Sequence, residues 1–578
     1  MADSLKKRGQ KLIRKFSIAT TRASRRSSER IQTNLVERVS HIRNVRLLIF
    51  EWVLLVVALI MLALAQAFWF GDSYAENVYT TGGTYTEATV GEVNSMNPLF
   101  ATTNSEKVLS KLMFATIATV DYSGHPGNQL AKSITASENG RRWTVELREN
   151  LKWSDGEPIT TDDVIFTAEL IKNPMVNTIY GANLANVKVS VDENGAVIFD
   201  LPSTYADFMS ALNFPVVPKH VLDRADPKAL IEDAFSNTPV TSGAFTYNAT
   251  QSITSNGEKI YYLSANPNYY LGRPMVNSFA VHTYTNKDSV VEAVNAGTVT
   301  ATAELSGADA NRIVTNQFIQ RNSSLSSGAY IFFNTAHNAV SSTETRQSIR
   351  QGINLEKIRE LAPEVAALDY PLTNSQIEII NYPVVPGYDP SAAKEKIAKL
   401  NENGPVHLDV ATVNSGYLPS VTNAIADDLR DLGFDVNVSV YEENQEFINN
   451  VVSKRSYDIL VYEIELGADP DLLPYYHSSQ ATGAGLNLSS YKNVLVDDLL
   501  LGARDTIDNG LRAKKYESFL QYWVNDVPAI GLYQPNLTYY YNKNVRTYSN
   551  NVRLMTAIDR FSDVTDWAVN KTTKNKTP

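Results

Sequence analysis

Pairs of neighbouring carboxylates are the side chains of this sequence best suited to acid-base chemistry. They occur at Asp162/Asp163, Asp427/Asp428, Asp469/Asp471 and Asp497/Asp498. Hydrolysis of a glycosidic bond needs two carboxylates that face one another across a cleft. Three of these pairs have the setting of helix starts or solvated helix faces, and only Asp469/Asp471 lies in a predicted loop among aromatic residues. A surface hydrolase with dispersed carboxylates therefore stays open as an alternative.

Other kinds of catalytic or cofactor chemistry lack their residues. The chain has no cysteine, which excludes disulfides, thiolate metal sites, thiol catalysis and a lipidated N-terminal cysteine. Its seven histidines include no pair at metal-ligand spacing, and no zinc-protease, nucleophile-elbow or phosphate-loop motif occurs. The glycines at Gly483 and Gly485 lack the third glycine of a dinucleotide site. We therefore expect no metal and no cofactor.

The charge is unevenly distributed along the chain. Residues 1–46 contain thirteen Lys or Arg and three Asp or Glu, whereas the whole chain has a net charge of −10. The part of the chain that follows is therefore strongly acidic. Because contacts to phosphates need concentrated positive charge, we expect this body not to bind nucleic acid.

An apolar run, LLIFEWVLLVVALIMLALAQAFWF, separates the basic tail from the acidic body at residues 47–70. As a helix it would be roughly 36 Å long, enough for the ~30 Å hydrocarbon core of a bilayer. The positive-inside rule then predicts a single-pass membrane protein with a cytoplasmic tail at 1–46 and an extracytoplasmic body. The alternative is a cleaved signal peptide, since Ala65 and Ala67 resemble a small-x-small cleavage site.

Helix-like and strand-like segments alternate along the body. A helix is predicted to begin at Asp162 and Asp163, and a hairpin is predicted over residues 188–201. Farther along, the hydrophobic periodicity predicts helices at 348–361, 390–404 and 420–434 and strands at 406–413, 435–442 and 457–465. This alternation is typical of an α/β fold with open sheets.

A series of motifs resembles family 5 of the bacterial extracellular solute-binding proteins, the peptide- and nickel-type receptors of ABC importers. The most specific is LRENLKWSDGEPITTDDV at residues 147–164. Shorter matches follow the family's order over about residues 84–548, at 92–98, 129–143, 241–245, 266–274, 331–334, 346–350, 388–394, 432–436, 457–458, 469–470 and 526–530.

The resemblance implies a two-lobed, periplasmic-binding-protein-like α/β fold of class II, the large peptide-binding type, behind the N-terminal transmembrane helix. Two hinge crossings, near residues 285 and 530, would join the lobes. The expected segments are a tail (1–46), a transmembrane helix (47–70), a linker (71–83), lobe I with an inserted subdomain (84–285), lobe II (286–530), a return to lobe I (531–560) and a C-terminal tail (561–578).

The resemblance also implies ligand contacts. In peptide-binding members an acidic side chain, shortly after a Trp, holds the α-ammonium of the peptide. The matching stretch at 462–470 departs from that pattern, since it has neither the Trp nor an Asp at the usual offset, and Glu465 is expected in that role, with Tyr462 as a wall. Glu463 is an alternative to Glu465, and both could instead face solvent. The remaining matches to ligand-contacting positions are Thr103, Asn104, Tyr180, Phe447, Asp469 and Tyr533. In contrast, the signature residues Trp153, Asp155 and Gly156 are expected to fix a turn.

The expected function is therefore that of a membrane-tethered substrate-binding protein of an ABC transporter, not an enzyme. It would capture oligopeptides between two closing lobes and deliver them to permease subunits. A receptor for a nickel chelate, glutathione or a saccharide is an alternative within the class. A surface hydrolase and a sensor or adhesion ectodomain are the alternatives outside it.

Overall fold

The computed structural model describes residues 46–578 except 121–125, 177, 179, 185, 254–256, 364, 374–375, 443–444, 484, 550–553 and 576–578. The basic tail predicted at 1–46 thus lies outside the described residues, apart from Arg46. The chain divides into two compact units, one formed by Met1–Val78 with Thr572–Pro578 and the other by Tyr79–Lys571.

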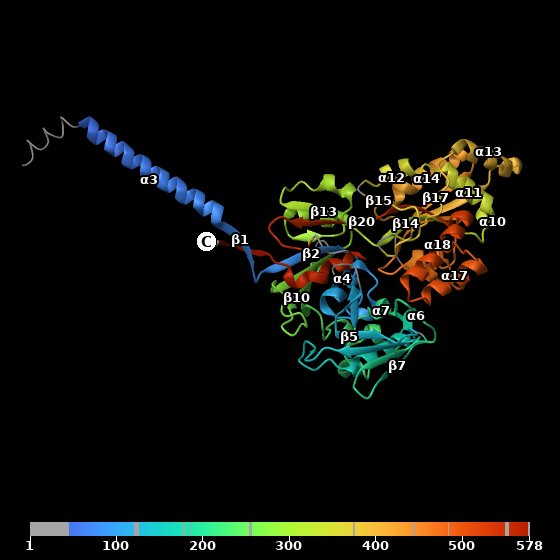
Figure 1. The fold of residues 1–578 in the computed structure, drawn as a ribbon, viewed down its shortest axis with the longest axis horizontal. Coiled ribbons are helices and arrows are strands. Elements are labelled where there is room, and N and C mark those ends of the chain that lie inside the picture. The colour runs from blue at the N-terminus through green and yellow to red at the C-terminus, as the bar shows by residue number, and fades with distance from the viewer. Residues whose placement is uncertain are drawn as a thin grey trace, which may run out of the picture. The chain divides into compact units, whose positions relative to one another are not determined.

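One long helix, α3 (Arg46–Tyr74), dominates the first unit (Figure 1). The apolar run is helical, as predicted, and its large side chains, such as Phe50, Leu54 and Leu62, are exposed. The side chains of α3 are described over residues 50–66. Within the described residues, no helix combines the length and apolarity needed to cross a membrane. The transmembrane helix predicted at 47–70 is therefore not supported. After α3, strand β1 (Ala75–Thr80) pairs with β21 (Asn570–Asn575).

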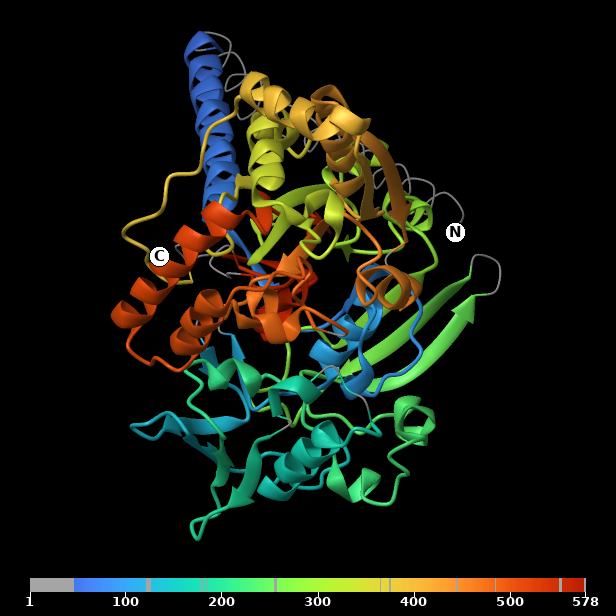
Figure 2. The ribbon, with the colours of Figure 1, turned by 90° about the vertical axis from the view of Figure 1, so that its right-hand side faces the viewer.

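The second unit contains a seven-stranded mixed sheet in the order β13-β20-β12-β2-β11-β10-β9. Its central strand β2 runs parallel to β11 and β12, and the other pairings are antiparallel. The strands are β2 (Thr84–Val90), β9 (Phe245–Ile253), β10 (Glu258–Ala265), β11 (Ser278–Tyr284), β12 (Ala301–Thr302), β13 (Phe318–Ser324) and β20 (Asn536–Asn542). The β9–β10 hairpin forms two long green strands in Figure 2.

Aromatic side chains form the core against this sheet. The ring of Tyr85 lies 5.1 Å from that of Phe279 and 5.0 Å from that of Trp567, so segments from both ends of the body share one core. The helices of this region are α4 (Asn104–Met113), α9 (Lys287–Ala296) and the 3-10 segment η9 (Ala557–Asp566).

A smaller inserted subdomain follows β2. It has a four-stranded sheet in the order β5-β6-β8-β7 and a two-stranded sheet of β3 and β4. The predicted helix at Asp162 and Asp163 is α5, and the predicted hairpin at 188–201 is formed by β7 and β8. The elements are β3 (Ala118–Val120), β4 (Pro126–Asn128), β5 (Ala131–Ala136), β6 (Arg142–Leu147), α5 (Thr161–Lys172), α6 (Gly181–Leu184), β7 (Lys188–Val191), β8 (Val197–Asp200), α7 (Phe208–Ala211) and α8 (Lys219–Leu222).

The signature residues at Trp153 form a turn, as predicted. The indole of Trp153 is fully buried, and the backbone N–H of Gly156 donates to the backbone carbonyl of Trp153. Gly156 has a φ of 98°, a left-handed value that glycine adopts without strain.

A six-stranded sheet in the order β15-β19-β14-β18-β16-β17 with its helices is called the second lobe here, and the seven-stranded sheet with its helices the first lobe. Every residue of β14 is buried, as in a strand that is covered on both faces. The strands are β14 (Ser327–Phe333), β15 (Ala366–Ala367), β16 (His407–Val413), β17 (Asp435–Tyr441), β18 (Ile459–Glu465) and β19 (Ala529–Gln534). The strands predicted at 406–413, 435–442 and 457–465 are thus confirmed.

Helices cover this second sheet. In α14, Val421, Ile425 and Leu429 are buried at the four-residue spacing of one helix face. The helices are α10 (Asn338–Ser341), α11 (Thr343–Gly352), α12 (Leu355–Glu360), α13 (Pro390–Leu400), α14 (Leu418–Leu432), α15 (Gln445–Phe447), α16 (Leu473–Tyr476), α17 (Val494–Arg504) and α18 (Asn509–Asp526). The three helices predicted from periodicity correspond to α11 with α12, α13 and α14.

The chain passes between the two large sheets twice. It leaves the first sheet at the end of β13, enters the second with β14, and returns between β19 and β20. The crossing expected near residue 285 differs from this arrangement, because β12 and β13 still belong to the first sheet. The return expected near residue 530 lies a few residues later, at Pro535. In Figure 1, β13, β20 and β2 lie together, apart from β14 and β17 of the second sheet.

Candidate binding cleft

Two cavities lie between the lobes, the larger of them beside both crossings. The larger has a volume of about 730 Å³ and is lined by Glu304 and Thr538 of the first lobe and by Tyr417, Glu463 and Tyr533 of the second. The smaller, of about 400 Å³, has lining residues from the first lobe, the inserted subdomain and the turn after β18. Asn104 and Ala557 line both cavities, so the two cavities meet beside these residues.

Helix α4 places Asn104 at this junction. The hydroxyl of Thr103 accepts a hydrogen bond from the backbone N–H of Glu106 at 3.2 Å, and the carboxylate of Glu106 accepts one from the backbone N–H of Thr103 at 3.0 Å. This reciprocal capping box fixes the start of the helix. Thr103 thus serves the helix start, and the next residue, Asn104, presents its amide to the cleft.

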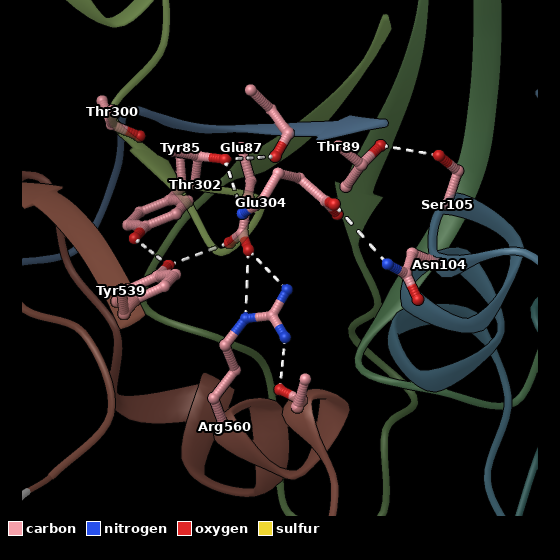
Figure 3. Close-up of polar contacts among 12 residues, drawn as sticks. Tyr85, Glu87, Thr89, Asn104, Ser105, Thr300, Thr302, Glu304, Tyr539 and Arg560 are labelled. Carbon is pink, nitrogen blue, oxygen red and sulfur yellow. Dashed lines mark hydrogen bonds and ion pairs between the residues drawn. The ribbon is translucent and has the colours of Figure 1, made fainter. Parts of the chain in front are cut away.

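Glu304 lies just beyond the carboxyl end of β12, where open α/β sheets bind ligands. The Asn104 Nδ2 atom donates to its carboxylate at 3.5 Å (Figure 3). Burial raises the pKa of Glu304, whereas Arg560, the backbone amide of Val90 and the Asn104 side chain each oppose that rise. Glu304 is therefore a partly buried acid on the cleft surface. Sequence reasoning missed it, although the alternating run TVTATAE at 298–304 indicates a strand that ends at an acid.

A buried ion pair lies beneath Glu304. The guanidinium of Arg560 donates to one oxygen of Glu87 at 2.6 and 3.0 Å, and the Tyr539 hydroxyl donates to the other oxygen at 2.9 Å. The hydroxyl of Tyr85 is 2.8 Å from that of Tyr539. Figure 3 shows that β2, β20 and η9 supply these side chains. Because Arg560 also donates to the carbonyl of Ala557, the network holds one of the two residues that line both cavities.

Besides Asn104, three more of the predicted contact residues line the cavities. Tyr180 and Glu465 line the smaller cavity, and burial raises the pKa of Tyr180 to about 12. Tyr533 is buried beside the larger cavity, where burial and then the nearby Glu463 carboxylate raise its pKa. Glu463 and Glu465 are two residues apart on β18 and therefore share one face of the strand. One lines each cavity, so both face the cleft.

The other predicted contact residues lie away from the cavity linings described above. Phe447 is buried in the core of the second lobe, 5.6 Å from the ring of Tyr441 and 5.8 Å from that of Tyr462. Asp469 forms an ion pair with Arg512 of α18. In the described part of the chain, no three His, Cys, Asp or Glu side chains come together as a metal site.

A comparison with models of known protein families identifies the family of this chain. The model described as "Bacterial extracellular solute-binding proteins, family 5 Middle" matches residues 125–485. The chain belongs to this family. The resemblance seen in the sequence motifs is thereby confirmed, as is the expectation of a binding protein rather than an enzyme. Extracellular solute-binding proteins act outside the cytoplasm, which agrees with an extracytoplasmic body.

Several known proteins resemble this family 5 protein. The oligopeptide-binding protein AppA of Bacillus subtilis is 25% identical over 485 residues, which are 79% of this chain and 87% of AppA. The structure of AppA with a nonapeptide has a TM-score of 0.72 at 22% identity and covers 85% of this chain and 100% of AppA.

Two further structures share the fold. The ABC transporter substrate-binding protein CtaP of Listeria monocytogenes has a TM-score of 0.73 at 20% identity, covering 85% of this chain and 100% of CtaP. NikZ of Campylobacter jejuni, solved with Ni(L-His), has a TM-score of 0.72 at 20% identity, covering 84% of this chain and 99% of NikZ. The predicted two-lobed α/β fold agrees with these likenesses.

Proposed function

We propose that this family 5 protein is the substrate-binding protein of an ABC importer and that it captures peptides in the cleft between its lobes. The observation that carries the proposal is the pair of adjoining cavities lined from both lobes. A ligand in these cavities contacts both lobes at once, so it stabilises their closed arrangement over an open one. The likeness to the oligopeptide-binding protein AppA supports peptides as the ligand class.

Glu465 is the proposed contact for the α-ammonium of the peptide. Its side chain is exposed in the smaller cavity, as required of a group that meets a ligand. Tyr180, in the same cavity, offers an apolar ring to the peptide. Asn104 offers an amide to its backbone, and Tyr533 lines the larger cavity beside the return crossing. Phe447, Tyr462, Thr103 and Asp469 support these residues rather than contact the ligand.

Binding of a peptide pool tests the proposal. The full chain, purified in mild detergent, is incubated with random peptides, washed and eluted, and the retained molecules are identified by mass spectrometry. We expect intact peptides, and we expect Glu465→Gln to weaken their binding by more than about tenfold, which is ~1.4 kcal/mol. Asp498→Asn, at an exposed position of α17 outside the linings of both cavities, serves as the control and should leave binding near the wild-type value.

The other possible results each point to a different function. Retention of a nickel chelate, glutathione or a saccharide, with no peptide, would keep the receptor class and reject the peptide. Recovery of cleaved peptides would instead support a surface hydrolase.

We also propose that residues 47–70 anchor the body at the outer face of the cell membrane, with residues 1–46 in the cytoplasm. The apolar run, its basic flank and the exposed large side chains along residues 50–64 support this proposal. The test is extraction of isolated membranes with alkaline carbonate. The anchored protein stays in the membrane pellet, and recovery of the intact full-length chain in the supernatant would reject the anchor.

A further inference from the structure

The charges that surround the junction of the two cavities do not cancel. Glu87 and Glu304 both lie near Arg560, and of these two carboxylates only Glu87 accepts hydrogen bonds from Arg560 among the contacts described. The partners that favour the charged form of Glu304 at short range, the Asn104 side chain and the Val90 amide, are neutral. The group of two carboxylates and one guanidinium therefore has one net negative charge when all three are ionised.

The larger cavity extends this negative character. Glu304, Glu442 and Glu463 line it together with a single lysine, Lys287. A further lining acid, Asp288, is already paired with an arginine outside the lining, at 2.7 Å. The lining of the larger cavity is therefore acidic.

The smaller cavity lacks this excess of acid. Its charged lining residues are Lys107, Lys111, Glu465 and Asp559, and Lys111 lies 3.6 Å from the Asp559 carboxylate. The remaining two, Lys107 and Glu465, are opposite in sign. Negative charge is thus concentrated at the junction and in the larger cavity, and the cleft has an electrostatic direction along its length.

An extended ligand that occupied both cavities would lie against Glu304 at their junction. Its carboxylate accepts from Asn104, and Asn104 lines both cavities (Figure 3). A carboxylate withdrawn from water is stabilised when a cation approaches it, because the new hydrogen bonds and Coulomb attraction replace lost hydration. A neutral ligand that covered Glu304 would remove the hydration of its carboxylate without supplying a charged partner in its place.

We propose that Glu304 binds a positively charged side chain of the ligand, so that the cleft selects peptides that contain lysine or arginine. This inference rests on the proposed peptide-binding function. In the resulting arrangement, Glu465 contacts the α-ammonium in the smaller cavity, and the basic side chain lies at the junction, directed into the larger cavity. Glu442 and Glu463 add attraction at longer range, which also favours capture of cationic peptides from solution.

Matched peptides test the selection. Isothermal titration of the full chain in mild detergent compares tetra-alanine peptides that contain one lysine with the same peptides containing norleucine, which has the aliphatic stem without the ammonium. We expect at least one position at which lysine binds more than about tenfold more tightly than norleucine. In Glu304→Gln, this preference should fall below about threefold, while the norleucine peptide keeps its wild-type affinity.

Glu442→Gln is the matched control, because Glu442 is an exposed acid of the same cavity that accepts from Asn414 at 3.0 Å. It should keep most of the preference for lysine. Equal binding of lysine and norleucine peptides by the wild type would overturn the inference, and so would an unchanged preference in a Glu304→Gln variant that melts at the wild-type temperature. If neither kind of peptide binds, it is the proposed peptide-binding function that fails, and the inference with it.

Discussion

Closure of the lobes should weaken as the pH rises, because a buried acid lies where the inserted subdomain meets the second lobe. Asp207, at the start of α7, is 8% exposed. Beside it, the backbone N–H of Ala206 donates to the carbonyl of Arg504 at 2.9 Å, and the Arg504 guanidinium lies 4.8 Å from the centre of the Tyr205 ring. The other charged groups that face Asp207 are Asp469, Asp471 and Arg512, all from the second lobe.

The size of the effect follows from the pKa of Asp207. Burial, and then the Asp469 carboxylate, raise this pKa from 3.8 to about 8, against opposing contributions from Ser210 and Arg512. Separation of the lobes would hydrate Asp207 and return it towards 3.8, so closure takes up a proton between these two values. Each unit of pH in that window then weakens closure by up to about tenfold. Below the window the acid is protonated in both arrangements, and above about pH 8 it is ionised in both, so the effect is level there.

Titration calorimetry at pH 5, 6 and 7 measures the pH dependence of binding in a range where the peptide's own ammonium stays protonated. Other carboxylates of the cleft also titrate, so the quantity to compare is the ratio of wild-type to Asp207→Asn affinity at each pH. This ratio should fall by up to about 100-fold from pH 5 to pH 7. Asp498→Asn, at an exposed position of α17, is the control and should track the wild type. A ratio that does not change with pH would refute the reasoning.

Two further predictions concern stability. Arg560→Met leaves the Glu87 carboxylate buried without its cation, and the unfolding free energy from urea denaturation should fall by about 3–5 kcal/mol. Adding Glu87→Gln should recover part of that loss. A wild-type urea midpoint for the single variant would contradict the argument. Gly243→Ala places a Cβ 2.5 Å from the carbonyl oxygen of Leu112, which should cost about 1–3 kcal/mol and lower the melting temperature. Gly387→Ala, where a Cβ has open space, should melt as the wild type does.

Local patterns predicted the helices and strands of the second lobe well, because hydrophobic periodicity depends on residues close in sequence. Strand β18 and helix α14 lie where the sequence predicts them. The assignment of strands to a sheet could not be predicted in this way. Strand β12 has only two residues and pairs with β2, more than two hundred residues earlier in the chain. No local pattern indicates that pairing, and the first crossing was therefore expected near residue 285.

Cleft residues were likewise predicted where a local motif marks them and missed where distant segments make their environment. Asn104 and Tyr180 were found from motif positions, and both line a cavity. Phe447 occupies a matching position but packs in the core, because an aromatic residue satisfies a motif whether it faces ligand or protein. Glu304 was missed because its environment is made by Asn104 and Arg560, which come from distant parts of the sequence.

The place of β20 in the first sheet determines when the cleft can form. This strand lies between β13 and β12, and it is among the last strands of the body in the chain. Until residue 542 is available, β12 and β13 have no strand to join them. Arg560 lies farther along the chain, so its ion pair with Glu87 forms only after that. Contacts of such long sequence separation form slowly, since a long loop must close before they gain anything. All strands of the second lobe lie before residue 536, so its sheet can be completed while the cleft waits for the C-terminal segment. A chain cut before residue 536 would keep the second lobe's strands without a site.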